Sequence, residues 1–71
     1  MPKIPDGKKM IKVLEKSGFY IDRQNGSHVI LKNADGSIIV VPIHAGKQLK
    51  LGLYKNILKD AKITEEEFWK K

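Results

Sequence analysis

The sequence of 71 residues contains no cysteine, which excludes disulfides and thiolate ligands for a metal ion. Aromatic residues are few, and no apolar run approaches the roughly 20 residues of a membrane-spanning helix. The first residues also lack the hydrophobic region of a signal peptide. We therefore expect a small soluble cytoplasmic protein, folded as a single domain over residues 1–71.

Acidic residues are scarce as well, since 8 Asp and Glu stand against 14 Lys and Arg, a formal net charge of +6. Glu65, Glu66 and Glu67 make up three of these acids, so residues 1–62 are still more basic. Positive charge on a small domain attracts polyanions, and nucleic acid is the commonest of them. A lysine-rich surface that serves solubility alone is the alternative interpretation.

The N-terminal part of the chain predicts an arm followed by an amphipathic helix. Pro2 and Pro5 disfavour regular structure, so we expect residues 1–5 to form an untethered arm. Asp6 can cap a helix that begins at the next residue, and Gly18 is suited to end it. Lysines fill one face of this helix, and the opposite face is predicted to consist of Met10, Val13, Leu14 and Ser17, with Ile11 at its edge.

Three strands are predicted next, over residues 19–24, 27–32 and 37–41. Asn25-Gly26 favours a type I′ hairpin turn, which would be closed by Gln24 and Ser27. The third strand is apolar without alternation, whereas a sheet covered on one side should alternate. Its second face should therefore be covered by the C-terminal segment or by a partner.

The C-terminal part predicts two helices. Apolar residues at i, i+3, i+4 and i+7 indicate a helix over residues 51–61, and Thr64 with Glu67 forms a capping-box pattern for a short last helix. The result is an α+β fold of order α-β-β-β-α(-α), with a three-stranded antiparallel sheet and helices on one face. Double-stranded-RNA-binding domains have this layout, although the order alone is a weak pointer to function.

The candidate chemistry lies at the first hairpin. Closure by Gln24 and Ser27 would place Arg23 directly opposite His28 on one face of the sheet. An imidazole ordinarily has a pKa of about 6.5, so His28 can act as general base or acid, with Arg23 as a phosphate clamp. RNA needs little more, because its own 2′-hydroxyl is the nucleophile. The alternative is a strand histidine that only forms a hydrogen bond at the sheet edge.

The other histidine, His44, belongs to a basic loop with Lys47 and Lys50, whose charges are available to phosphates. No carboxylate cluster accompanies the two histidines in the sequence. We therefore expect no metal site and no cofactor.

The chain resembles the HicA toxin family over nearly its whole length, from about Lys8 to Glu67. The resemblance rests on Ser17-Gly18-Phe19, Arg23, Gly26-Ser27-His28, Pro42-x-His44, Leu49-Lys50-x-Gly52 and Ile57-Leu58. Lys62 follows Ala61 where most members of the family have a glycine. This departure concerns the end of the helix and not catalysis.

The resemblance implies a fold like that of double-stranded-RNA-binding domains and an mRNA interferase that arrests translation when free. It also implies a HicB-type antitoxin as the silencing partner. Catalysis is assigned by the resemblance to His28, with Gly26 and Ser27 shaping the element, while His44 is expected to have a structural or RNA-positioning role. The rival functions are a non-catalytic RNA-binding module of the same fold and a small interaction protein whose charge is incidental.

Overall fold

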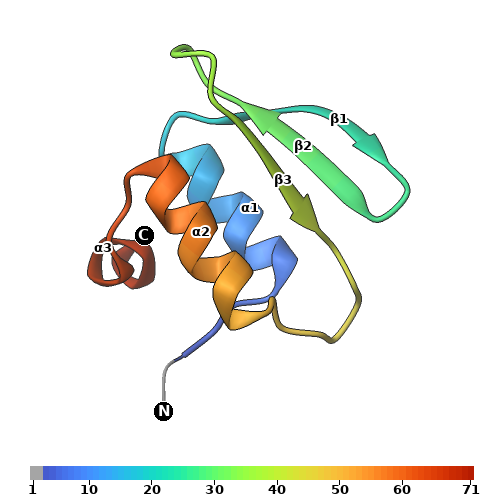
Figure 1. Ribbon diagram of the computed structural model, residues 1–71, viewed down its shortest axis with the longest axis vertical. Coiled ribbons are helices and arrows are strands. Elements are labelled where there is room, and N and C mark those ends of the chain that lie inside the picture. The colour runs from blue at the N-terminus through green and yellow to red at the C-terminus, as the bar shows by residue number, and fades with distance from the viewer. Residues whose placement is uncertain (1–2) are drawn as a thin grey trace.

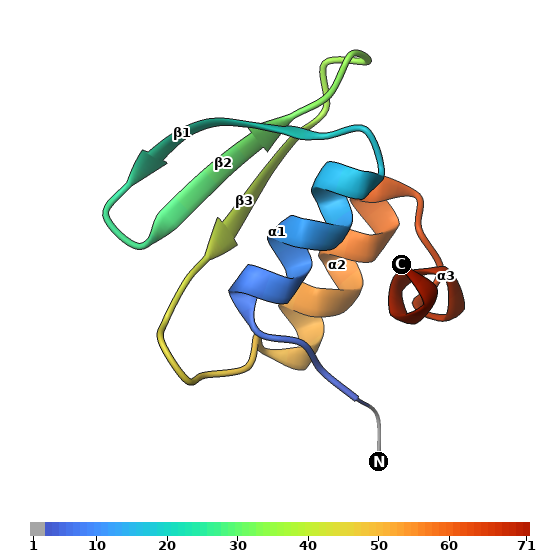
Figure 2. The ribbon, with the colours of Figure 1, turned by 180° about the vertical axis from the view of Figure 1, so that it is seen from behind.

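The computed structural model describes residues 3–71 as a three-stranded sheet with helices packed on one of its faces. The elements are α1 (Gly7–Lys16), β1 (Tyr20–Asn25), β2 (His28–Lys32), β3 (Ile38–Pro42), α2 (Leu51–Ala61) and α3 (Glu65–Lys70). The strands are antiparallel and follow the order β1-β2-β3, so β2 is central. Figures 1 and 2 show α1 and α2 side by side against the sheet, with α3 beyond them. The predicted α+β fold is confirmed.

The core fills the layer between the sheet and the two long helices. Burial alternates along β2 and β3, because one face of each strand packs on the helices and the other faces outward. The largest fully buried side chains are Tyr54, Phe68, Met10, Leu14, Leu31, Val13 and Val41. The apolar face predicted for the first helix is thus the face that enters the core.

Local capping signals set the limits of α1. The Asp6 carboxylate accepts a hydrogen bond from the backbone N–H of Lys9 at 2.8 Å. At the other end Gly18 has a φ of 96°, and the N–H of Phe19 donates to the carbonyl of Leu14 at 3.0 Å. Both predicted ends of this helix are confirmed.

Residues 3–5 do not form the untethered arm that the prolines predict. Pro5 is buried, and its carbonyl accepts a hydrogen bond from the N–H of Leu49 at 2.9 Å. Asp6 continues this contact as a bridge with Gln48. The prediction is wrong for these residues because residues 48–49, distant in sequence, form backbone contacts with Pro5 and Asp6 and hold them in place. Residues 1–2 lie outside the described residues.

The first hairpin turns one residue later than predicted. Asn25 pairs with His28, so Gly26 and Ser27 are the central residues of the turn. Gly26 has a φ of 58°, and it is the only one of these four residues with a positive φ. A positive φ at the first central position is the requirement of a type II′ turn. The predicted type I′ turn closed by Gln24 and Ser27 is wrong. The observed turn places Gly26 at the first central position, where a positive φ is needed and glycine adopts it at the least cost.

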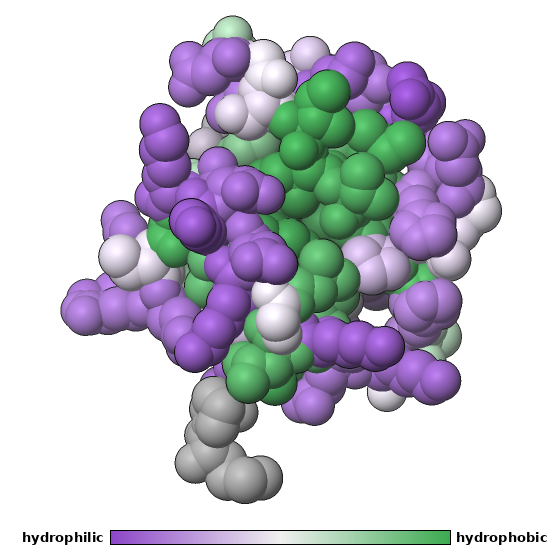
Figure 3. Space-filling view, viewed as in Figure 1, coloured by the Kyte–Doolittle hydropathy of each residue, from purple (hydrophilic) through white to green (hydrophobic). Residues whose placement is uncertain are grey.

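The outer face of β3 is open. Ile38 and Val40 expose 58% and 44% of their surface, while Ile39 and Val41 are buried beneath them. The C-terminal helix packs against the other helices and does not reach this face (Figures 1 and 2). Within residues 3–71, the C-terminal segment therefore does not cover the second face of β3. The space-filling view shows an apolar area over this part of the molecule (Figure 3).

The C-terminal helices begin and end as the sequence predicts. Lys62 ends α2 in the left-handed region, with a φ of 60°. Thr64 and Glu67 exchange two hydrogen bonds of 3.0 Å, which complete the predicted capping box of α3. The indole N–H of Trp69 donates to the hydroxyl of Tyr54 at 3.1 Å and fastens α3 to α2. No helix within residues 3–71 has the length and apolar character needed to cross a membrane.

Candidate active site

His28 is the first residue of the central strand and is exposed. Its backbone lies between Asn25 of β1 and Pro42 of β3, so neighbouring strands hold it on both sides. The next residue, Val29, is buried against the helices. Since side chains alternate along a strand, the imidazole of His28 stands on the open face of the sheet.

The hairpin turn is tied to the chain that leaves β3. The carbonyl of Ser27 accepts a hydrogen bond of 2.6 Å from the N–H of Ile43. This bond joins the Gly26-Ser27 turn to the segment that leads directly to His44. The turn that precedes His28 is thereby held in place by residues outside its own hairpin.

Arg23 lies on the same face as His28 but is not directly opposite it. Its partner is Ile30, two residues further along β2, so Arg23 and His28 are diagonal neighbours, roughly 7–8 Å apart, with their Cβ atoms somewhat closer. Direct opposition was wrong because moving the turn by one residue shifts the strand pairing by two. The common face was right, because the side-chain period of a strand is also two.

Asp22 is a charged neighbour that sequence reasoning missed. It is the extra residue of a bulge between Ile21 and Arg23, and its carboxylate lies 3.3 Å from the Arg23 guanidinium and 3.5 Å from the Lys32 ammonium. The Arg23 side chain remains 61% exposed. Asp22 therefore offsets part of the positive charge on this face. A bulge leaves no mark in the sequence from which its position could be inferred.

The predicted loop residues His44, Lys47 and Lys50 come together around one hollow of about 300 Å³. The carbonyl of His44 accepts a hydrogen bond from the N–H of Lys47 at 3.0 Å, which closes the loop on itself. All three side chains belong to exposed residues. The loop thus presents two ammonium groups and an imidazole to solvent.

Pro42 connects this hollow to His28, because it lines the hollow and is also the β3 partner of His28. Neighbouring strand backbones lie about 4.8 Å apart, so the hollow begins one strand away from the backbone of His28. Arg23 lies on the other side of His28, toward β1. The structure therefore sets His28 between a guanidinium on one side and a basic loop on the other.

This arrangement combines an acid–base group with cations on both sides, which suits the handling of a phosphodiester. Within the described part of the chain, no group of three or more His, Cys, Asp or Glu is placed to hold a metal ion. Fold and site together define the class: a small, basic α+β domain with the strand order of double-stranded-RNA-binding domains and an exposed histidine on its sheet.

The family model described as HicA toxin of bacterial toxin-antitoxin matches residues 7–63. This match covers most of the 71 residues, and the chain belongs to the HicA toxin family. Membership supports a toxin role within a toxin–antitoxin system, with an antitoxin as the partner. No curated protein matches the chain.

Proposed function

We propose that this protein is an endoribonuclease toxin that cleaves mRNA by acid–base catalysis through His28, without a metal ion, and so inhibits translation. The observation that carries the proposal is the position of His28, exposed on the central strand between Arg23 and the loop of Lys47 and Lys50. Membership of a toxin family supports it.

In the proposed reaction, the 2′-hydroxyl of the RNA attacks the adjacent phosphorus. His28 takes the proton of that hydroxyl and delivers it to the leaving 5′-oxygen as the bond between phosphorus and oxygen breaks. The products are a 2′,3′-cyclic phosphate and a free 5′-hydroxyl. Arg23 and the loop lysines stabilise the negative charge that develops on the phosphorus oxygens.

The remaining site residues bind and position the RNA backbone in this proposal. Lys47 and Lys50 attract the phosphates, and His44 shares their hollow. Ser27 presents its hydroxyl from the turn, while Gly26 gives the turn its positive φ. The hydrogen bond between Ser27 and Ile43, which brings this turn and this loop to the same strand ends, supports the proposal that they act on one RNA segment.

We also propose that a HicB-type antitoxin silences the toxin by covering the open face of the sheet. Tyr20, Ile38 and Val40 expose 53%, 58% and 44% of their surface, and their strand positions place them on the His28 side. An apolar surface of this kind is typical of a protein interface. Because the toxin has a net charge of +6, the complementary antitoxin surface is acidic.

The test is cleavage of a defined RNA in EDTA by the wild type and by His28→Ala. We expect the variant to lose about 10²- to 10⁴-fold of the activity, the usual contribution of general acid–base catalysis. Since His28 is exposed, circular dichroism should show both proteins folded. Equal cleavage by the two would remove His28 from the mechanism, and loss of wild-type activity in EDTA would refute a metal-free reaction.

A second candidate function is RNA binding without cleavage, which the basic loop supports by itself because its charges require no proton transfer. In that case the wild type would bind the RNA with strong salt dependence and leave it intact over hours. The same RNA and the same variants separate the two functions.

A further inference from the structure

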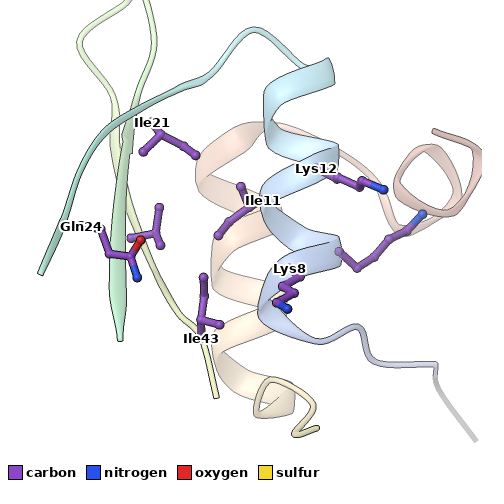
Figure 4. Close-up of a pocket in the computed structure, with 8 residues that line it drawn as sticks. Lys8, Ile11, Lys12, Ile21, Gln24 and Ile43 are labelled. Carbon is purple, nitrogen blue, oxygen red and sulfur yellow. The ribbon is translucent and has the colours of Figure 1, made fainter. Parts of the chain in front are cut away.

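A groove of about 510 Å³ lies between α1 and the sheet, on the side opposite His28. Its apolar lining comes from Ile11 of α1, Ile21 of β1, Val29 of β2 and Ile43. Figure 4 shows Ile11, Ile21 and Ile43 directed into the space between α1 and the strands. This volume lies within the roughly 300–1,000 Å³ of typical ligand sites.

The groove exists because the helices bury the inward-facing residues of β2 and β3 but leave those of β1 exposed. Ile21 and Gln24 pair with the buried residues Leu31 and Val29, so both face the helix layer. All six residues of β1 are nevertheless exposed, and Ile21 keeps 47% of its surface accessible. An isoleucine on the core side of a sheet therefore remains open to a partner.

Positive charge borders this apolar lining. Lys8, Lys9 and Lys12 of α1 contribute to the groove wall, and none of its lining residues within 3–71 is acidic. In Figure 4 the Lys12 ammonium points away from the groove, and the Lys9 ammonium donates to the carbonyl oxygen of Lys71 at 3.5 Å, so both charges lie along the outer side of α1. The groove thus combines an apolar interior with one wall, α1, whose outer side carries positive charge.

The apolar lining and the charge distinguish between the possible occupants of the groove, which are RNA, a second copy of the chain and a partner protein. The lining residues given by the structure include no aromatic ring, so the groove offers no stacking platform for RNA bases. A second copy of the chain carries the same net charge of +6. Its acidic run precedes Phe68, which is buried in its own core and cannot serve as an anchor.

We propose that the groove docks an acidic, amphipathic segment of the antitoxin. Leucine- or isoleucine-like side chains enter between Ile11 and Ile21, and flanking carboxylates lie beside the lysines of α1. The segment holds the toxin on the face opposite His28, so it adds affinity without touching the proposed catalytic group. This inference rests on membership of a toxin–antitoxin family and not on the nuclease reaction.

The probe is a synthetic nonapeptide of alternating leucine and glutamate, followed by methyl and amide NMR of the toxin. We expect shifts at Ile11, Ile21 and Ile43, and no binding by a control peptide in which serine replaces leucine. Ile21→Glu should weaken binding about tenfold or more, because an apolar contact is lost and like charges meet. Leu51→Glu is the matched control, since Leu51 is an exposed apolar residue of α2 outside both the groove and the open sheet face, and it should change the affinity less than twofold. Lys8→Glu should weaken binding and flatten its salt dependence.

Other outcomes would overturn the proposal. Equal binding of the serine peptide would show attraction by charge alone, and equal weakening by Ile21→Glu and Leu51→Glu would place the contact elsewhere. Shifts of the groove methyl signals on addition of an RNA oligonucleotide would make the groove an RNA site. A dimer that Ile21→Glu dissociates would make the occupant a second copy. If Ile21→Glu does not fold, the peptide affinities of Ile21→Ser and Lys8→Glu, measured in the same way, test the proposal in its place.

The antitoxin complex provides the second readout. When the toxin is co-expressed with the antitoxin and the complex is purified, the Ile21→Glu toxin should dissociate from the antitoxin about tenfold faster than the wild-type toxin. An unchanged dissociation rate would show that the antitoxin does not use the groove. Neither result depends on whether His28 cleaves RNA, so this inference and the proposed function fail separately.

Discussion

Gly7, the first residue of α1, lies so close to the carbonyl oxygen of Pro42 that a Cβ on Gly7 would overlap it. Pro42 is also the β3 partner of His28. The start of α1 therefore rests on the strand end that holds the candidate catalytic residue. The absence of a side chain at position 7 is what permits this contact.

Gly7→Ala should destabilise the fold by about 1–3 kcal/mol, because the added methyl group must push α1 away from β3. Gly52→Ala is the matched control, since Gly52 also lies in a first helical turn but has open space around it. It should stabilise the protein by up to about 1 kcal/mol through helix propensity. Urea denaturation of the two variants measures both effects, and equal stabilities would contradict the close contact.

Arg23→Ala should lower RNA cleavage modestly, and Arg23→Lys should restore part of it, because a point charge replaces some of the role of a guanidinium. Arg23 is a diagonal neighbour of His28 and is already paired with Asp22, so its loss should cost less than that of His28. Single-turnover cleavage of a defined RNA measures the difference. A loss as large as that of His28→Ala would mean that Arg23 acts directly at the reacting phosphate.

RNA affinity should fall steeply with salt, with a log–log slope of about −0.7 for each phosphate contact on a single strand. Replacing Lys47 and Lys50 together by alanine should make the slope less steep by about 1.4, since two contacts are lost. Lys55 and Lys59, exposed on α2, provide the control pair, whose replacement should leave the slope nearly unchanged. Equal effects of the two pairs would indicate attraction by overall charge rather than a basic loop.

Lys62→Gly should stabilise the protein by about 1 kcal/mol, because a non-glycine residue in the left-handed region costs roughly 1–2 kcal/mol. For a domain of this size that gain corresponds to an increase in Tm of about 4–8 °C. Lys62→Ala removes the charge but keeps the backbone cost, so its Tm should stay near that of the wild type. Similar gains for both variants would trace the effect to charge.

The capping box of α3 should make stability depend on pH. The Thr64 backbone N–H donates to the Glu67 carboxylate and lowers the pKa of that carboxyl, with a smaller contribution from the Thr64 hydroxyl. A lowered pKa means that the contribution is present above the ordinary value near 4.5 and is lost as pH falls through the folded pKa.

Thermal unfolding of the wild type and of Glu67→Gln tests this dependence. The wild type should be the more stable of the two at pH 7, and their Tm values should converge as pH falls below 4.5 and through the lowered pKa of the folded protein. Glu65→Gln is the control, because Glu65 lies in the same turn and makes no bond to Thr64, whereas Glu66 is paired with Lys70. A difference that persists at low pH would assign the effect to packing.

The sequence by itself determined the helices and their ends. Capping by Asp6 and Thr64 and the left-handed position at Gly18 depend on residues within one or two turns, so they can be read without the rest of the chain. The choice of His28 and of the loop residues came from local motifs and from the family resemblance. The roles of these residues stay predictions.

Only the tertiary structure decided how those pieces meet. The pairing of Asn25 with His28 depends on the backbone geometry of the turn, and the bulge at Asp22 depends on the packing of β1 against β2. Pro5 is held by Leu49, and Gly7 meets Pro42, over separations in sequence that no local pattern records. The open groove beside Ile21 likewise depends on the position of the helices, which leave β1 exposed. Burial is a property of the assembled layers, so the sequence of one strand does not reveal it.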